Sequence, residues 1–200
     1  MNRPRHFLKL LALVACLLCS MSAAAAEAYA CYTPENTTLT FYYDNQRSTR
    51  EGTTYDLNEG AVYPAWYSDG TYSSVTLVVF DSSFANARPT TTYYWFHGMN
   101  NLSNCIGMEY LNTSQVTDMS YMFYDCHKMT YLDVSSFNTA NVTNMKSMFY
   151  GCYALTSLDL SGFNTANVRN MRYMFCDCRN LTSLDLSSFS TANVMDLVYT

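Results

Sequence analysis

A period of 26 residues runs through the second half of this 200-residue chain, and it constrains the fold more than any other feature. The same residue types return at this spacing in several columns. These columns are Val116, Val142, Val168 and Val194; Phe137, Phe163 and Phe189; Cys126, Cys152 and Cys178; and the Met-Phe pairs at 122–123, 148–149 and 174–175. The period lies within the range of leucine-rich repeats, about 20–29 residues. One unit cannot bury its apolar face alone, so we expect neighbouring units to stack.

Each unit combines two local patterns. Leu158-Asp-Leu160 alternates apolar and polar residues, which predicts a short strand with its leucines pointing inward. Val168, Met171 and Met174 recur every three residues, which predicts one or two short helical turns. The predicted fold class is therefore a repeat solenoid of leucine-rich-repeat type. It has short parallel strands on one face, short helical turns on the other, and a small N-terminal β cap.

The first thirty residues carry the pattern of an export signal. The basic residues Arg3, Arg5 and Lys9 precede an apolar stretch at 10–18 and small residues at 20–26. We expect residues 1–26 to be a signal peptide, with cleavage possible up to residue 30, and the protein to be secreted or at the cell surface. Lipoprotein anchoring at Cys16 is an alternative. The apolar stretch is shorter than the ~20 residues of a transmembrane helix.

The mature chain divides into two predicted segments. Residues 31–74 lack the 26-residue period and form the β-rich N-terminal cap, with strands expected at Thr38–Tyr43 and Thr53–Leu57. A hairpin is expected around Ser68-Asp69-Gly70. Residues 75–200 form the solenoid. Its first turns are degenerate, and its last repeat is truncated at Thr200.

Repeated polar residues and cysteines have structural explanations. Asn141, Asn167 and Asn193 should form a ladder whose amides bind loop backbone. Stacked cysteines have parallel side chains, which is poor geometry for a disulfide, so we expect packed thiols. The Cys176-Asp-Cys178 pair lacks a second pair or a nearby histidine, so we expect no metal site. The state of Cys31 and Cys105 stays open.

The run Val142-Thr-Asn-Met-Lys-Ser-Met-Phe-Tyr-Gly-Cys-Tyr-Ala-Leu-Thr-Ser-Leu-Asp-Leu-Ser161 closely resembles the repeats of BspA-like leucine-rich-repeat surface proteins. Those repeats read V-T-x-M-x-x-M-F-x-x-C-x-x-L-x-x-L-x-L-S, and the resemblance covers about residues 75–200. It implies a secreted or surface-displayed protein of host-associated bacteria. It also implies adhesion, including binding of extracellular-matrix proteins and coaggregation with other bacterial cells. No catalytic residues come with the family.

The predicted function is a protein-interaction scaffold, adhesin-like, which binds surface macromolecules through the concave solvent side of its strands. This face carries hydroxyls and one acidic column. The candidate binding residues are Tyr131, Asp133, Ser135, Ser157, Asp159, Ser161, Ser183, Asp185 and Ser187. Expected partners are extracellular or cell-surface proteins of the matrix type, or other bacterial cells. A basic or hydroxyl-rich partner suits the acidic column, and weak calcium bridging is an alternative.

Composition argues against other classes of function. The net charge of −5 provides no basic face for nucleic acid. The chain has three histidines and no recognisable catalytic motif, so we expect neither an enzyme nor a cofactor. Two alternatives to adhesion stay open. One is a structural or antigenic display protein without a specific ligand. The other is a carbohydrate-binding module in the N-terminal β region, suggested by Tyr42, Tyr43, Tyr63, Trp66 and Tyr67.

Overall fold

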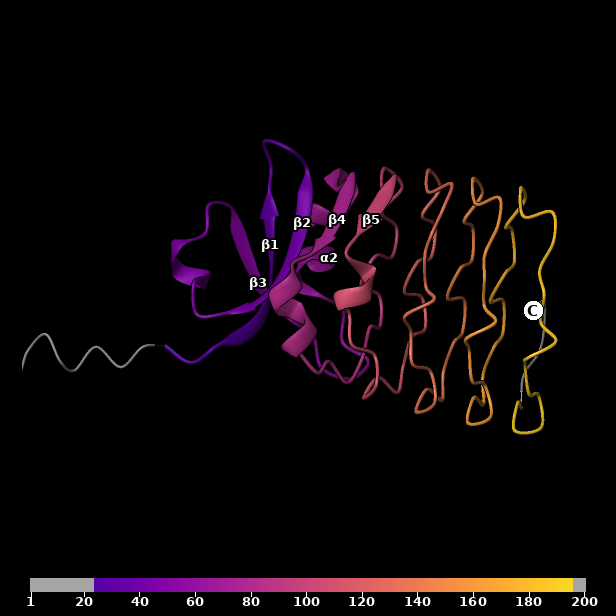
Figure 1. The fold of residues 1–200 in the computed structure, drawn as a ribbon. Coiled ribbons are helices and arrows are strands. Elements are labelled where there is room, and N and C mark those ends of the chain that lie inside the picture. Colours follow the sequence, from indigo (N-terminus) through magenta and orange to yellow (C-terminus); the bar gives the residue numbers. More distant parts are fainter. Residues whose placement is uncertain (1–23, 196–200) are drawn as a thin grey trace, which may run out of the picture.

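A computed structural model describes residues 24–195 of the protein, so the predicted signal peptide lies almost wholly outside the described residues. Five strands form one mixed sheet at one end of the molecule (Figure 1). They are β1 (Glu27–Thr33), β2 (Thr38–Asp44), β3 (Thr53–Asp56), β4 (Leu77–Phe80) and β5 (Asn104–Ile106). Their order in the sheet is β3-β1-β2-β4-β5. The sheet therefore continues across the boundary that the sequence predicts at residue 74.

The sheet changes from antiparallel to parallel at β2. β1 and β2 form an antiparallel hairpin, and β3 adds antiparallel to β1. β2 pairs in parallel with β4, and β4 with β5. The parallel register sets Leu39 beside Val78 and Phe41 beside Phe80, and all four side chains are buried. Leu39 and Phe41 are two residues apart, so these apolar side chains of β2 share one face of the sheet.

The helices between these strands are short. Only α2 (Ala65–Ser68) is an α-helix among the described residues, and the 3₁₀ turns are η1 (Arg47–Thr49), η2 (Thr71–Ser74), η3 (Ser82–Asn86) and η4 (Met108–Tyr110). The hairpin predicted around Ser68–Gly70 is wrong, because α2 and η2 occupy that segment. α2 instead buries Trp66, whose indole Nε1 donates to the Trp95 carbonyl over 2.7 Å.

The predicted fold class, a leucine-rich-repeat solenoid with strands on one face and helical turns on the other, is wrong. The described residues form a single mixed five-stranded sheet with few short helices. After η4, residues 111–195 contain neither a strand nor a helix. Parallel pairing there is limited to isolated bridges that join Thr91, Asp118, Asn144 and Asn170 in turn. The leucine segments at 132–134 and 158–160 are irregular.

Side chains that compete for the backbone explain the missing strands. The carboxylate of Asp159 accepts from the backbone N–H of Ser161 over 2.9 Å. The carboxylates of Asp133 and Asp185 accept in the same way from the N–H groups of Ser135 and Ser187. Asp118, Asn144 and Asn170 form the same local turn beside the isolated bridges. Aspartate and asparagine thus offer backbone donors an alternative to a strand ladder.

Left-handed residues explain the missing helical turns. Tyr121, Ser147 and Tyr173 stand at the same place in successive repeats and have φ of 59°, 53° and 61°. A residue in this region cannot continue a right-handed helix. The spacing of three in the Val-Met-Met pattern therefore reflects a series of tight turns.

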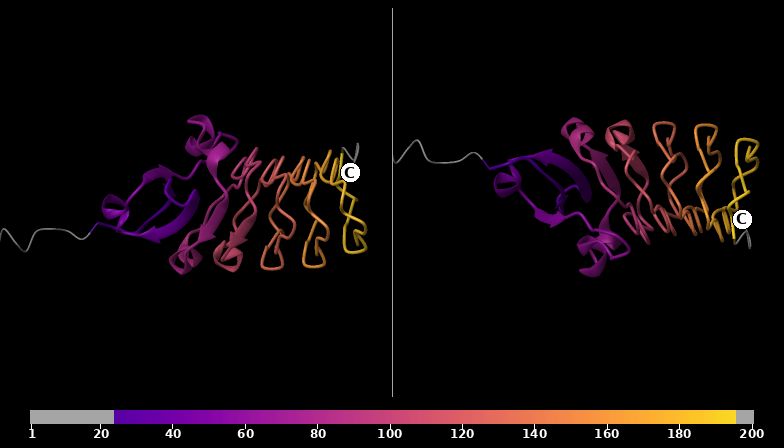
Figure 2. Two further views of the ribbon diagram at one scale, coloured as in Figure 1. Left: turned by 90° about the horizontal axis from the view of Figure 1, so that it is seen from above. Right: turned by 90° about the horizontal axis from the view of Figure 1, so that it is seen from below.

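In these turns, backbone N–H groups donate alternately to carbonyls of the next repeat unit and to carbonyls of their own unit. We call each 26-residue unit a layer, at 116–141, 142–167 and 168–193. In the first layer, Tyr121 N–H donates to the Lys146 carbonyl and Phe123 N–H to the Met148 carbonyl, both over 2.9 Å. The intervening Met122 N–H donates back to Met119 within its own layer. Successive chain loops therefore lie side by side, as Figures 1 and 2 show.

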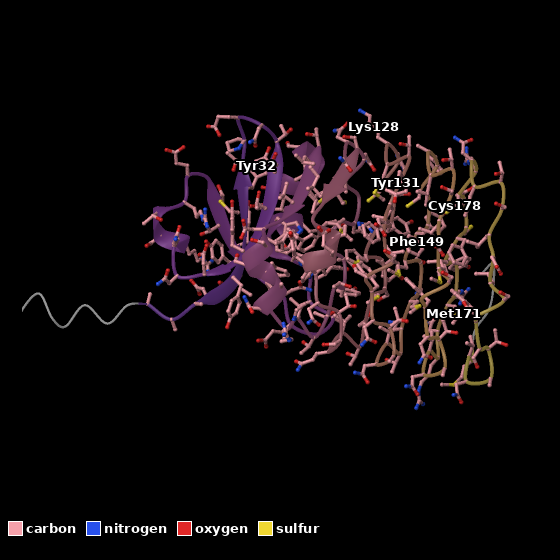
Figure 3. All side chains as sticks on the ribbon, viewed as in Figure 1. Tyr32, Lys128, Tyr131, Phe149, Met171 and Cys178 are labelled. Atoms are coloured by element: carbon pink, nitrogen blue, oxygen red, sulfur yellow. The ribbon has the colours of Figure 1, made fainter. Side chains whose placement is uncertain are left out.

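Apolar side chains fill the interior of the layers. The rings of Phe123, Phe149 and Phe175 are nearly parallel, with centroids 5.7 Å and 5.9 Å apart. Phe149 and Met171, labelled in Figure 3, are buried among the surrounding side chains. This interior is continuous with the apolar face of the sheet, so one hydrophobic core runs through the described residues.

Polar ladders join the edges of the layers. Asn141, Asn167 and Asn193 each donate a side-chain N–H to a carbonyl 27 residues earlier, over 2.7–2.8 Å. The repeated asparagines thus bind loop backbone as predicted, although their side chains lie on the surface. Thr139 and Thr165 are buried, and their hydroxyls donate to carbonyls 25 residues ahead.

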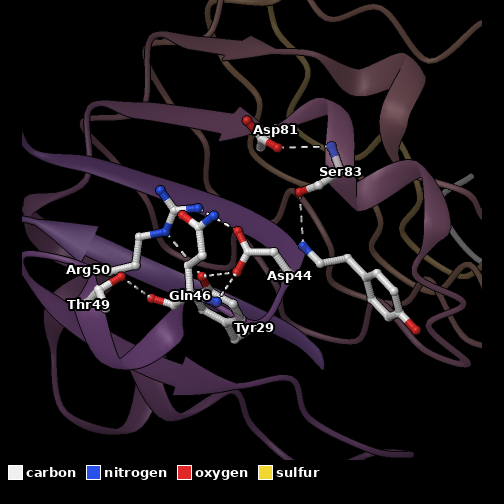
Figure 4. Close-up of polar contacts among 8 residues, drawn as sticks. Tyr29, Asp44, Gln46, Thr49, Arg50, Asp81 and Ser83 are labelled. Atoms are coloured by element: carbon white, nitrogen blue, oxygen red, sulfur yellow. Dashed lines mark hydrogen bonds and ion pairs between the residues drawn. The ribbon is translucent and has the colours of Figure 1, made fainter. Parts of the chain in front are cut away.

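A polar network lies where β1 begins and β2 ends (Figure 4). Arg50 donates to the Asp44 carboxylate over 2.5 Å and to the Tyr29 hydroxyl over 3.1 Å. The Tyr29 hydroxyl in turn donates to Asp44 over 2.7 Å. Burial raises the pKa of Tyr29 to about 12, so this phenol stays neutral. The network ties β1 and β2 to the segment after η1.

Candidate binding groove

One groove crosses three layers on the side of the leucine segments. Its volume is about 510 Å³, and it is open to solvent. Its lining contains seven of the nine candidate binding residues: Tyr131, Asp133, Ser135, Ser157, Asp159, Ser183 and Asp185. Leu132, Val134 and Leu158 also line it. The structure therefore gathers one carboxylate from each of three layers above an apolar floor.

The remaining two candidates, Ser161 and Ser187, are exposed but do not line the groove. Their backbone N–H groups instead hold the carboxylates of Asp159 and Asp185 over 2.9 Å and 2.8 Å. None of the nine lies on a strand, because residues 111–195 contain none.

Hydrogen bonds keep the groove's carboxylates ionised. The hydroxyl and backbone N–H of Ser135 lower the pKa of Asp133, and the N–H and hydroxyl of Ser161 lower that of Asp159. Ser187 lowers the pKa of Asp185 in the same way. Repulsion between neighbouring carboxylates is modest, because they are exposed to water. The row is therefore a persistent negative strip at neutral pH.

Tyr131 forms one end of the groove. Its side chain is 62 % exposed, in contrast to the neighbouring Leu132 at 4 %. Tyr131 is labelled in Figure 3. An exposed aromatic ring beside a carboxylate row can pack on the aliphatic part of a lysine or arginine that pairs with the carboxylates.

The aromatic residues of the N-terminal region do not form one platform. Trp66 is fully buried in the core. The guanidinium of Arg50 covers the Tyr42 ring, 3.7 Å from its centroid. Tyr63 and Tyr67 face a different set of neighbours, at 5.4 Å from each other. Four of the five residues suggested for a carbohydrate module are thus divided: Trp66 lies in the core, Tyr42 in the ion-pair network, and Tyr63 and Tyr67 in a third cluster.

The six cysteines among residues 24–195 are free thiols. Cys126, Cys152 and Cys178 donate to the carbonyls of Phe96, Phe123 and Phe149 over 3.1–3.2 Å. Burial raises the pKa of the Cys126 thiol and that of the Cys152 thiol well above the usual range of a cysteine. No group of three or more histidine, cysteine or acidic residues among residues 24–195 is placed to hold a metal ion.

Comparison with known proteins places the layers in a family. Residues 90–200 match the family described as "Mycoplasma protein of unknown function, DUF285". The chain belongs to the DUF285 family. The DUF285 match contains all nine candidate binding residues and leaves out Tyr63 and Tyr67. No curated protein and no solved structure matches the chain. Within residues 24–195, every helix is too short or too polar to cross a bilayer.

Proposed function

We propose that this protein is an exported or surface-displayed scaffold that binds other proteins through the groove. The partner contributes a segment rich in lysine or arginine, and its class is an extracellular or cell-surface protein of the matrix type or a protein on another bacterial cell. The resemblance of the repeats to BspA-like surface proteins supports the adhesive role, and the export pattern at 1–26 supports the location.

The observation that carries the proposal is the row of Asp133, Asp159 and Asp185 in one groove. Each carboxylate is exposed and held by a turn, so little conformational freedom is lost on binding. Serine hydroxyls beside them can bind backbone or side-chain groups of the partner. No lysine, arginine or histidine lines the groove, so the three aspartates are the charged residues of its lining. Electrostatic complementarity of this kind raises association rates and selects basic partners.

Charge reversal in the middle of the row is the direct test. The purified protein is passed over immobilised fibronectin and fibrinogen, and binding is measured by surface plasmon resonance at low and high salt. Asp159→Lys should weaken binding by about tenfold or more, because it removes an attraction and adds a repulsion. Asp159→Asn keeps the side-chain oxygen that accepts from Ser161, so it preserves the turn and should give an intermediate loss.

Glu35→Lys is the matched control, because it changes the net charge by the same amount as Asp159→Lys. Glu35 is exposed in the turn between β1 and β2. Binding by this variant should equal that of the wild type. Equal loss in Glu35→Lys and Asp159→Lys would point to general charge and contradict a role for the groove. Absence of binding to both matrix proteins and to bacterial cells would favour a display protein without a ligand.

A further inference from the structure

Five tyrosines from three separate segments of the sequence meet on the surface. We call this the tyrosine patch: Tyr63, Tyr67, Tyr93, Tyr94 and Tyr121. Tyr94 stands at its centre, with ring centroids 4.7 Å from Tyr63, 4.5 Å from Tyr93 and 4.9 Å from Tyr121. Tyr67 lies 5.4 Å from both Tyr63 and Tyr94. The patch joins the segment around α2 to the first layers and shares no residue with the groove.

The patch is accessible to a ligand. Tyr63 is 50 % exposed and Val62 beside it 63 %, while the other four tyrosines are half-buried. Asn58 holds this loop in place, because its side-chain amide donates to the carbonyls of Val62 and Tyr93 over 2.8 Å and 3.1 Å. The rings are therefore presented on a fixed loop.

Two of these tyrosines have a left-handed backbone. Tyr94 and Tyr121 have φ of 61° and 59°, a left-handed conformation that favours glycine or asparagine. Ser147 occupies the equivalent position in the next layer at φ 53°, so the layer does not need a ring there. Tyr173 shares the conformation at 61°, so the left-handed backbone belongs to the turn, while the residue type at this position varies between layers.

The chemistry of the patch is aromatic, neutral and rich in hydroxyls. Burial raises the pKa of Tyr93 to about 12 and that of Tyr94 further, with the neighbouring phenols acting in the same direction. The phenols therefore stay protonated and can both donate and accept hydrogen bonds. Lys146, whose ammonium lies 5.4 Å from the Tyr121 ring centroid, is the cation at the edge.

The size of the patch favours a small ligand over a protein. A tyrosine presents roughly 200 Å², so the exposed parts of these five rings amount to about 300 Å². A standard protein interface takes roughly 800 Å² from each partner. A pyranose ring offers one face of C–H groups, which pack on aromatic rings, and hydroxyls at its edge, which match phenols.

We propose that the tyrosine patch is a binding site for a neutral glycan, contacting a few pyranose units of a chain. This site is separate from the groove, so either can fail without the other. A glycan site beside a protein-binding groove would let the molecule hold two kinds of surface ligand.

The test is a titration of the purified protein with defined neutral oligosaccharides, namely cellotetraose, chitotetraose and maltotetraose, followed by NMR of the tyrosine rings. At least one should bind and shift the ring signals of the patch. Tyr121→Ser and Tyr63→Ala should each weaken that binding by about tenfold or more. Tyr173→Ser is the matched control, because Tyr173 has the same left-handed backbone but lies two layers away, and binding should be unchanged.

Three results would overturn the proposal: no binding by any of the three oligosaccharides, equal loss in Tyr121→Ser and Tyr173→Ser, or binding of a decaproline peptide in their place. Folding is checked by circular dichroism. Tyr121→Ser copies the residue that the next layer already carries, so it should fold. Binding to the groove's partner should also be unchanged in this variant, which keeps the two sites distinguishable.

Discussion

The imidazole of His97 lies between two tyrosine rings, beside the tyrosine patch. Its centroid is 4.1 Å from that of Tyr94 and 4.5 Å from that of Tyr124, and the three planes are nearly parallel. The Nδ1 atom is buried without a hydrogen-bond partner among the described residues. Burial lowers the pKa of His97 to about 4, so the ring is neutral at pH 7.

This shift predicts that stability depends on pH. Between pH 6.5 and about 4, the unfolded chain binds a proton at this histidine and the folded chain does not. The free energy of unfolding should therefore fall by about 3 kcal/mol as pH drops from 7 to 4, through this group alone. Urea titrations at several pH values measure the change.

His97→Tyr is the variant to compare, because Tyr124 and Tyr150 stand at the equivalent positions of the next layers and continue the same stack, 4.6 Å apart. The tyrosine does not titrate in this range, so the variant should show a shallower loss of stability between pH 6.5 and 4. Identical pH profiles for the two proteins would contradict the assignment to His97.

At the scale of elements, Gly107 shows how the sheet passes into the irregular segment. It follows β5 and precedes η4, with φ of 74°. A Cβ atom built there would lie 2.3 Å from the carbonyl oxygen of Phe80 at the end of β4. The close approach and the left-handed backbone both require glycine.

Gly107→Ala should destabilise the protein by about 2 kcal/mol or more, since it adds a backbone clash to left-handed strain. Gly60→Ala is the control, because Gly60 has φ of 57° but no atom within 4 Å of a built Cβ. It should lose only about 1 kcal/mol. Denaturant midpoints measure both values, and an equal cost in the two variants would show that the clash at Phe80 is relieved.

The strands could be predicted where apolar and polar residues alternate. β2 and β3 agree with the strands predicted at Thr38–Tyr43 and Thr53–Leu57, within one residue at their ends. β1 was missed, because three consecutive buried residues, Tyr29, Ala30 and Cys31, hide its alternation beside the export signal. The layers show the limit of a repeat: the period identifies which residues meet, but it carries no information about backbone dihedrals.

The row of carboxylates in the groove could be predicted from the sequence, but the tyrosine patch could not. Asp133, Asp159 and Asp185 share one column of the repeat, so their common row follows from the period alone. Tyr63 and Tyr67 come from a segment without the period, and only the folded chain brings them to Tyr94. The left-handed backbone of Tyr121 also could not be predicted, because glycine and asparagine are the residues that prefer this conformation.

At the scale of the whole molecule, the continuous core couples the sheet to the layers. Trp66 and Trp95 are buried near the sheet, and Phe41 contacts both rings. The same cluster extends without a break to Leu160 and Val168. We therefore expect the described residues to unfold in one cooperative transition.

Leu160→Ala tests this coupling, because Leu160 is 1 % exposed and lies in a layer far along the chain from both tryptophans. The loss should be about 2–5 kcal/mol. Tryptophan fluorescence and far-ultraviolet circular dichroism should shift to lower denaturant together. A shift in circular dichroism with an unmoved fluorescence transition would show that the layers unfold on their own.

The two junctions between the three layers share a repeated set of backbone bonds. Tyr121 N–H donates forward to Lys146, and Ser147 N–H donates forward to Arg172, while Thr143 and Arg169 donate backward to Thr117 and Thr143. A duplication or deletion of one 26-residue unit, in frame, would thus create a junction that the molecule already contains. Copy number can drift during evolution without new interfaces having to arise, and each added unit would lengthen the acidic row by one carboxylate, so reach and valency would change together.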